Sequence, residues 1–139
     1  MSDQLTRLVV SGVLLLHGLG HGGALAALAW IGLRPGGDTG GWSAARSWIV
    51  PSLSPGTATL VASAFWIVSL AGFVVVAGAA WFDLGEWWRA LAVGCAVVSL
   101  VGIVLFFGTW PAFNAVAGLA VNIAVLVAIL LLSWPPRVA

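Results

Sequence analysis

Charged residues are scarce in this sequence, and their scarcity excludes several classes of protein. The 139 residues include five arginines, no lysine and four acidic residues, so only 6% of the chain is charged. A soluble domain carries roughly 25% charged residues, and this chain could hide its apolar residues from water only by leaving its surface apolar too. No cluster of basic residues is present that would bind nucleic acid. A soluble domain is therefore excluded, and nucleic acid is not an expected partner.

Cysteine and tyrosine are also scarce. Cys95 is the single cysteine, so an internal disulfide is excluded. Tyrosine is absent, whereas tryptophan occurs nine times. Several tryptophans lie at the ends of apolar runs, which predicts an aromatic belt at the depth of the lipid headgroups; they are Trp81, Trp87, Trp88, Trp110 and Trp134.

Long hydrophobic runs dominate what is present. Hydrophobic residues make up 62% of the chain, and the mean hydropathy is +1.15. A transmembrane helix needs about 20 apolar residues, and four runs meet this length, at residues 8–33, 59–82, 90–107 and 114–132. The runs are continuous and do not alternate as the strands of a membrane barrel do. The sequence therefore predicts an all-α membrane protein, a single antiparallel bundle of four transmembrane helices in contact with the lipid bilayer.

The connection between the first two runs is the only long one. Within it Trp42, Ala45 and Ile49 would share one face of a helix, opposite Arg46. This pattern predicts a short amphipathic helix over residues 41–50 that lies in the membrane interface and ends before Pro51.

The arginines predict the orientation of the chain. With an even number of spans, Arg7, Arg89 and Arg137 lie on one side of the membrane, and Arg34 and Arg46 lie on the other. The side with more arginines is expected to be cytoplasmic, which places both termini in the cytoplasm. Helical spans argue against an outer-membrane barrel, so the expected location is the inner membrane of a bacterium.

A small set of polar residues interrupts the apolar runs at similar depth, and it predicts a polar layer near the middle of the bilayer. Two of its members, His17 and His21, are one helical turn apart on the same face of the first run. In one interpretation the layer holds neighbouring helices together by hydrogen bonds. The predicted layer consists of His17, His21, Ser69, Ser99 and Asn122.

Other interpretations of the two histidines stay open. Two histidines at i and i+4 can bind one metal ion, and Cys95 is the candidate third ligand within the spans. Haem with two axial histidines normally takes them from facing helices, so it would require a second copy of this chain. Imidazole also titrates near neutral pH and can protonate a quinone oxygen, which makes a proton or quinone site at His17 or His21 a further alternative.

Small residues on the first run predict close helix packing. Gly18 and Gly22 form a Gly-x-x-x-Gly pair beside the two histidines. Such pairs let two helix backbones approach closely in a membrane. The approaching helix would come either from the same bundle or from a second copy.

The segment Leu16-His17-Gly18-Leu19-Gly20-His21 resembles a motif in small uncharacterised bacterial four-helix membrane proteins, which are distantly similar to the DoxX-like group. Trp110 and the segment from Gly118 to Asn122 resemble further features of these proteins. The sequence departs from them after Trp110, where the resemblance implies charged residues, often Asp and Lys, and this chain has residues 111–114 as Pro-Ala-Phe-Asn. The resemblance implies a four-helix membrane fold and a role beside membrane redox complexes that feed quinone.

The leading hypothesis from the sequence is a non-catalytic membrane component. It would pack with itself or with a partner through the glycine-rich face of the first run, and no residue set indicates a catalytic site. The first alternative is a redox-associated or quinone- or lipid-binding subunit that uses the face of His17 and His21. The second alternative is a small transporter, which would require an oligomer because four spans without internal repeats offer no pathway alone.

Overall fold

The computed structural model describes residues 2–34 and 39–135, and its regular structure is helical throughout these residues. The long helices are α1 (Asp3–Leu33), α2 (Pro55–Phe82), α3 (Trp87–Leu105) and α4 (Ala112–Leu126). A 3₁₀ turn, η1 (Phe107–Thr109), follows α3, and a π-helical segment, η2 (Val127–Leu131), continues α4. The predicted all-α fold with four membrane-spanning helices is therefore confirmed, and the chain is a multi-pass integral membrane protein.

All four helices begin earlier than the apolar runs indicate, and the difference is largest for α1 and α2. α1 begins at Asp3 rather than at residue 8, because the Ser2 side chain caps it by accepting a hydrogen bond from the amide of Leu5. α2 begins at Pro55 rather than at residue 59, since Ser54 caps it. α1 and α2 contain 31 and 28 residues, so at about 1.5 Å per residue both exceed the roughly 30 Å hydrocarbon thickness.

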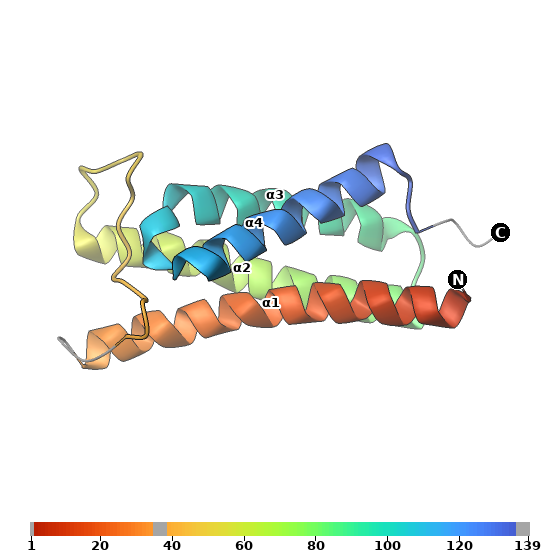
Figure 1. Cartoon of the computed structure of the whole chain (residues 1–139), viewed down its shortest axis with the longest axis horizontal. Helices are drawn as coiled ribbons and strands as arrows, with labels where there is room; N and C mark the ends of the chain where they lie inside the picture. Colours follow the sequence, from red (N-terminus) through yellow and green to blue (C-terminus); the bar gives the residue numbers. More distant parts are fainter. Residues whose placement is uncertain (1, 35–38, 136–139) are drawn as a thin grey trace.

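Consecutive helices are antiparallel and lie next to one another, and both ends of the described chain lie at the same end of the bundle (Figure 1). α1 packs along α2, α2 along α3, and α3 along α4. α4 lies close to α1 at the end of the long connection and diverges from it toward the end that carries the termini (Figure 1). The two helices that close the bundle are therefore in contact over only part of their length.

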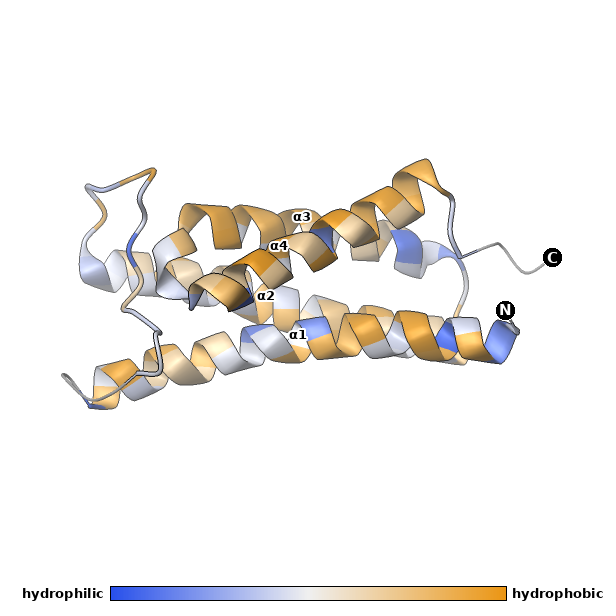
Figure 2. Ribbon diagram, viewed as in Figure 1, coloured by the Kyte–Doolittle hydropathy of each residue, from blue (hydrophilic) through white to orange (hydrophobic). Residues whose placement is uncertain are grey.

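The outer surface of the bundle is apolar, as lipid contact requires. Hydrophobic residues make up most of each helix, and hydrophilic residues lie near helix ends and midway along α1 and α4 (Figure 2). Leu16, Leu60 and Leu131 are 71%, 72% and 76% exposed. In water, the exposure of these side chains would be unfavourable in free energy, whereas hydrocarbon solvates them directly.

The interior contains two apolar clusters at different depths. The cluster at the end with the termini includes Leu14, Phe73 and Val125. The cluster at the end with the long connection includes Trp66, Ile103 and Phe106. Along α1, α3 and α4 the polar residues fall between the two clusters, so the core consists of two apolar layers with a polar layer between them.

The predicted interfacial helix over residues 41–50 is wrong. This segment is irregular, and buried residues alternate at Ala45 and Ser47, which is the spacing of an extended chain. Two of its polar groups bond to the bundle: the amide of Ser43 donates to the carbonyl of Thr109, and the Trp48 indole donates to the carbonyl of Val104. The long connection therefore lies over the α3–α4 turn.

Candidate functional site

Four polar side chains from three helices meet in the middle of the bundle, and we call them the tetrad: His17 and His21 of α1, Ser99 of α3 and Asn122 of α4. The distance from His17 Nε2 to Asn122 Oδ1 is 2.9 Å. Asn122 Nδ2 lies 2.7 Å from Ser99 Oγ, and Ser99 Oγ lies 2.8 Å from His21 Nε2. The sequence placed these residues at similar depth, and the tertiary structure joins them into one hydrogen-bonded chain.

Donor and acceptor chemistry fixes the proton on one of the rings. A carboxamide oxygen only accepts hydrogen bonds, so His17 donates from Nε2 to Asn122 Oδ1. The Asn122 amide then donates to Ser99 Oγ. Asn122 is thus the central member, because its side chain bonds α1 through its oxygen and α3 through its nitrogen.

The members of the tetrad differ in burial. His21, Ser99 and Asn122 are 0% exposed, whereas His17 is partly exposed. The His17 ring packs edge-on against Phe73 of α2, with 4.7 Å between ring centroids. His17 is therefore the one member that a molecule dissolved in the membrane can reach from outside the bundle.

Ser69, the fifth residue of the predicted layer, is fully buried on α2 but is not joined to the tetrad. Within the part of the chain that the structure describes, its Oγ has no hydrogen-bond partner. The hydrogen-bonded chain therefore connects α1, α3 and α4, and α2 contributes apolar contacts to it.

The residues do not assemble a metal centre. Across residues 2–34 and 39–135, no three His, Cys, Asp or Glu side chains lie close enough together to hold a metal ion. Cys95 is buried where α2 and α3 meet, and a Cβ on Gly72 would lie 2.3 Å from its sulfur. Cys95 therefore serves α2–α3 packing, and the His17–His21 pair lacks the third ligand that a tight metal site requires.

The glycine pair of α1 is used inside the bundle. A Cβ on Gly18 would lie 3.0 Å from Cβ of Phe73, and a Cβ on Gly22 would lie 3.6 Å from the Leu70 side chain. Both glycines therefore face α2 of the same chain. Of the two sources that the sequence left open for the approaching helix, the same bundle is the one that covers Gly18 and Gly22.

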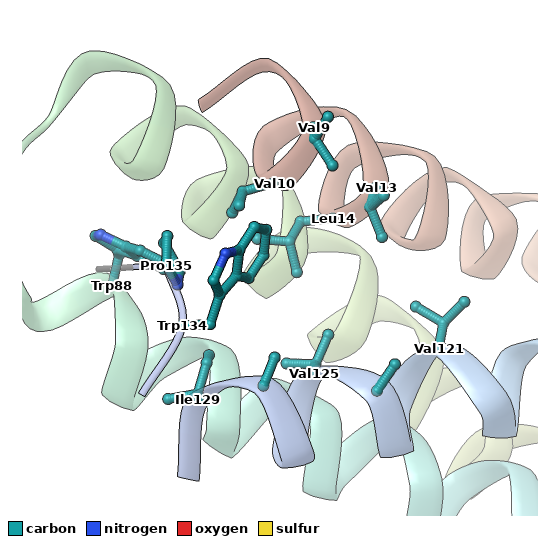
Figure 3. A pocket seen from close by; sticks show the side chains of 12 residues that line it. Val9, Val10, Val13, Leu14, Trp88, Val121, Val125, Ile129, Trp134 and Pro135 are labelled. Carbon is teal, nitrogen blue, oxygen red and sulfur yellow. The ribbon is translucent and has the colours of Figure 1, made fainter. Parts of the chain in front are cut away.

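An apolar cleft opens between α1 and α4 at the end where the two helices diverge (Figure 3). Its volume is about 180 Å³. The Trp134 ring lies between the two helices, and Leu14, one turn before His17 on α1, lies deeper in the cleft (Figure 3). The lining residues are Val9, Val10, Val13, Leu14, Trp88, Val121, Ala124, Val125, Ala128, Ile129, Trp134 and Pro135.

Sequence reasoning missed the aromatic residues that surround His21. Trp110 is only 7% exposed, so it does not join an aromatic belt, and its ring centroid lies 5.2 Å from that of His21. Trp66 is 0% exposed and lies 5.8 Å from Trp110 by the same measure. The available signal was the position of Trp66 inside an apolar run, away from both ends.

Comparison with known proteins assigns no family. No protein-family model matches the chain, and neither a curated protein nor a solved structure matches it. The resemblance to DoxX-like proteins therefore stays a prediction from the residues in the sequence, and the geometry of the tetrad and the cleft is the basis for a function.

Proposed function

We propose that this chain is a non-catalytic component of a membrane, which packs with itself or with a partner protein, and that the tetrad fixes the arrangement of its helices. The observation that carries the proposal is the Asn122 side chain, which bonds His17 of α1 and Ser99 of α3 at 2.9 Å and 2.7 Å. Three of the four tetrad side chains are 0% exposed. Polar side chains that are hydrogen-bonded between transmembrane helices hold those helices together.

Replacing Ser99 with alanine tests the packing role. Ser99→Ala removes hydrogen bonds to His21 and Asn122, and each interhelical hydrogen bond in a membrane is worth about 0.6–1.7 kcal/mol. The expected loss in free energy of unfolding is therefore about 1–3 kcal/mol, measured by detergent titration in mixed micelles. Ser11→Ala is the matched control, since Ser11 is 8% exposed and its Oγ has no hydrogen-bond partner among the described residues. Equal losses in the two variants would contradict the proposal.

The surface for association is a separate question, because the face of Gly18 and Gly22 is covered by α2. The proposal places association on the lipid-facing surface of the bundle. Light scattering of the purified protein in detergent measures its mass directly, and crosslinking in native membranes identifies a partner protein. A monomer that crosslinks to no protein in its native membrane would contradict the association.

The proposed location is the inner membrane of a bacterium, with both termini in the cytoplasm. The bundle places Arg7 and Arg89 at the end that carries the termini, and Arg34 and Arg46 at the opposite end. A membrane-impermeant maleimide tests the orientation on Ser2→Cys in a Cys95→Ala background. We expect labelling only after the inner membrane is permeabilised. Labelling of intact spheroplasts would show the opposite orientation.

A second candidate function is the binding of a quinone or another lipid-soluble molecule, as a subunit associated with a redox complex. The specific observation in its favour is the partial exposure of His17, one turn beyond Leu14 in the cleft between α1 and α4. A polar ring facing hydrocarbon is costly unless a polar group meets it. A ligand with a carbonyl group would place this polar group near the His17 ring, and its apolar chain would lie against the apolar lining of the cleft.

Tryptophan fluorescence tests this second function, because Trp88 and Trp134 line the cleft. A short-chain quinone titrated into protein in nanodiscs should quench their emission in a saturable way. Val121→Phe, which fills the cleft, should abolish saturation, whereas Val116→Phe should not, since Val116 is 58% exposed on α4 and lies outside the cleft lining. Identical quenching in both variants would show that the cleft is not the quinone site.

A further inference from the structure

Several buried polar atoms in and around the aromatic neighbours of His21 have no hydrogen-bond partner within the described residues. His21 Nδ1, Trp66 Nε1 and Trp110 Nε1 are buried and have no hydrogen-bond partner within the described residues. Ser69 Oγ, one turn along α2 from Trp66, and Thr109 Oγ1, next to Trp110, are in the same condition. Buried polar atoms are nearly always hydrogen-bonded in native proteins, so a concentration of them in one place points to a partner other than protein.

Ring contacts show that His21, Trp66 and Trp110 are neighbours, and Ser69 and Thr109 lie beside Trp66 and Trp110 in the chain. The Trp110 ring centroid lies 5.2 Å from that of His21 and 5.8 Å from that of Trp66. Ser69 and Thr109 are 0% and 1% exposed. The five residues come from α1, α2 and the turn between α3 and α4, and we call them the indole cluster.

We propose that the indole cluster holds ordered water, which extends the tetrad toward the membrane surface on the side of the long connection. The chemistry of the atoms selects this ligand. Two indole N–H groups can only donate, whereas an imidazole nitrogen without a proton and two hydroxyl oxygens can accept. Water accepts from donors and donates to acceptors at the same time, and buried waters typically make about three hydrogen bonds.

The assignment also settles the hydrogen bonds of the tetrad. With water donating to Nδ1, His21 carries its proton on Nε2 and donates it to Ser99 Oγ, 2.8 Å away. Ser99 Oγ then accepts from both His21 and Asn122. Two lone pairs on one hydroxyl oxygen match these two donors.

The cluster extends toward the end of the bundle that carries the long connection. Thr109 lies in η1 at the surface end of the bundle, directly beneath the long connection, where its carbonyl accepts a hydrogen bond from the amide of Ser43. Polar groups therefore follow one another from this surface to Trp110, His21 and the tetrad. On the other side of the tetrad the lining is apolar, so the proposed hydration enters from one side only. This inference goes beyond the proposed function and does not require it.

Water-edited solid-state NMR of the ¹⁵N-labelled protein in bilayers tests the proposal. Trp66→Phe and Trp110→Phe each remove one indole signal and thereby assign it, while keeping an aromatic ring. We expect water magnetisation to reach the two indole N–H groups several-fold faster than it reaches the backbone amide of Phe73, which is 0% exposed in the adjacent apolar core. The histidine ¹⁵N shifts should show an unprotonated Nδ1 on His21.

Each outcome decides the proposal. Faster transfer to both indoles, together with the expected His21 tautomer, supports it. Transfer to the indoles at the rate of the Phe73 amide would show a dry cluster and overturn the proposal. A non-water molecule found at the indoles by its own cross-peaks would overturn it as well. The transfer rates of the wild-type protein can be compared even if a variant fails to fold. The stability of Ser99→Ala is a separate measurement, so the water proposal and the proposed packing role can fail independently.

Discussion

The hydrogen bond between His17 and Asn122 should show a measurable coupling energy in a double-mutant cycle. His17→Leu and Asn122→Leu each remove one partner of the hydrogen bond and put an apolar side chain of similar size between α1 and α4. Effects that are separate for each site, such as the lost ring contact between His17 and Phe73, cancel in the cycle. What remains is the interaction between the two side chains.

The magnitude follows from the geometry. His17 Nε2 and Asn122 Oδ1 are 2.9 Å apart, Asn122 is 0% exposed, and the two residues lie on different helices. Interhelical hydrogen bonds measured by such cycles in a membrane average about 0.6 kcal/mol and reach about 1.7 kcal/mol. We therefore expect a coupling of about 0.6–1.7 kcal/mol, which is roughly a 3- to 18-fold change in the unfolding equilibrium constant. Asn122→Leu alone should cost about 1–3 kcal/mol, because it also removes the bond to Ser99.

Steric trapping in bicelles measures the four free energies of unfolding without leaving the bilayer-like phase. A cycle between His17→Leu and Ser11→Ala, two residues that share no hydrogen bond, gives the background coupling. A His17–Asn122 coupling no larger than this background would refute the reasoning, because the tetrad would then be a set of neighbours without energetic connection.

Two further predictions concern packing and the helix ends. Gly72→Ala should cost about 1–3 kcal/mol of stability through overpacking, since its Cβ would lie 2.3 Å from Cys95 Sγ. Adding Cys95→Ala should restore most of this loss, as measured by thermal unfolding in detergent. A double variant that stays as unstable as Gly72→Ala would contradict the assigned contact. Arg7→Ala should lower the free energy of unfolding by at most about 1 kcal/mol, because the Arg7–Asp83 ion pair of 2.6 Å joins side chains that are 34% and 56% exposed. A much larger loss of stability, or a loss that high salt does not reduce, would show that Arg7 does more than form this pair.

The fold class and the polar layer could be predicted from the sequence for different reasons. Four apolar runs of sufficient length leave the backbone no other way to satisfy its hydrogen bonds in a bilayer than to form helices. Depth along each helix follows from a fixed rise per residue, so His17, His21, Ser99 and Asn122 could be placed at similar levels. Ser69 was assigned to the same layer, but depth alone does not determine which residues share a hydrogen bond, and its Oγ has no partner among the described residues.

Residue spacing failed where contacts outside the segment decide the conformation. Residues 41–50 have the periodicity of an amphipathic helix, but hydrogen bonds to Val104 in the last turn of α3 and to Thr109 in η1 favour an irregular chain instead. Gly18 and Gly22 signalled close packing correctly, while the identity of the approaching helix was open until α2 was seen to cover them. In both cases the partner is distant in the sequence, so a local pattern carries no information about it.

By itself, the sequence determined that this chain spans a membrane with helices and carries histidines at mid-depth, because hydrophobicity and helical rise are local properties. Rotation of each helix about its axis is decided by packing against its neighbours, and that rotation selects which side chains meet. The tertiary structure therefore decided that Asn122 joins His17 to Ser99, that Trp66 and Trp110 surround His21, and that α1 and α4 diverge around a cleft.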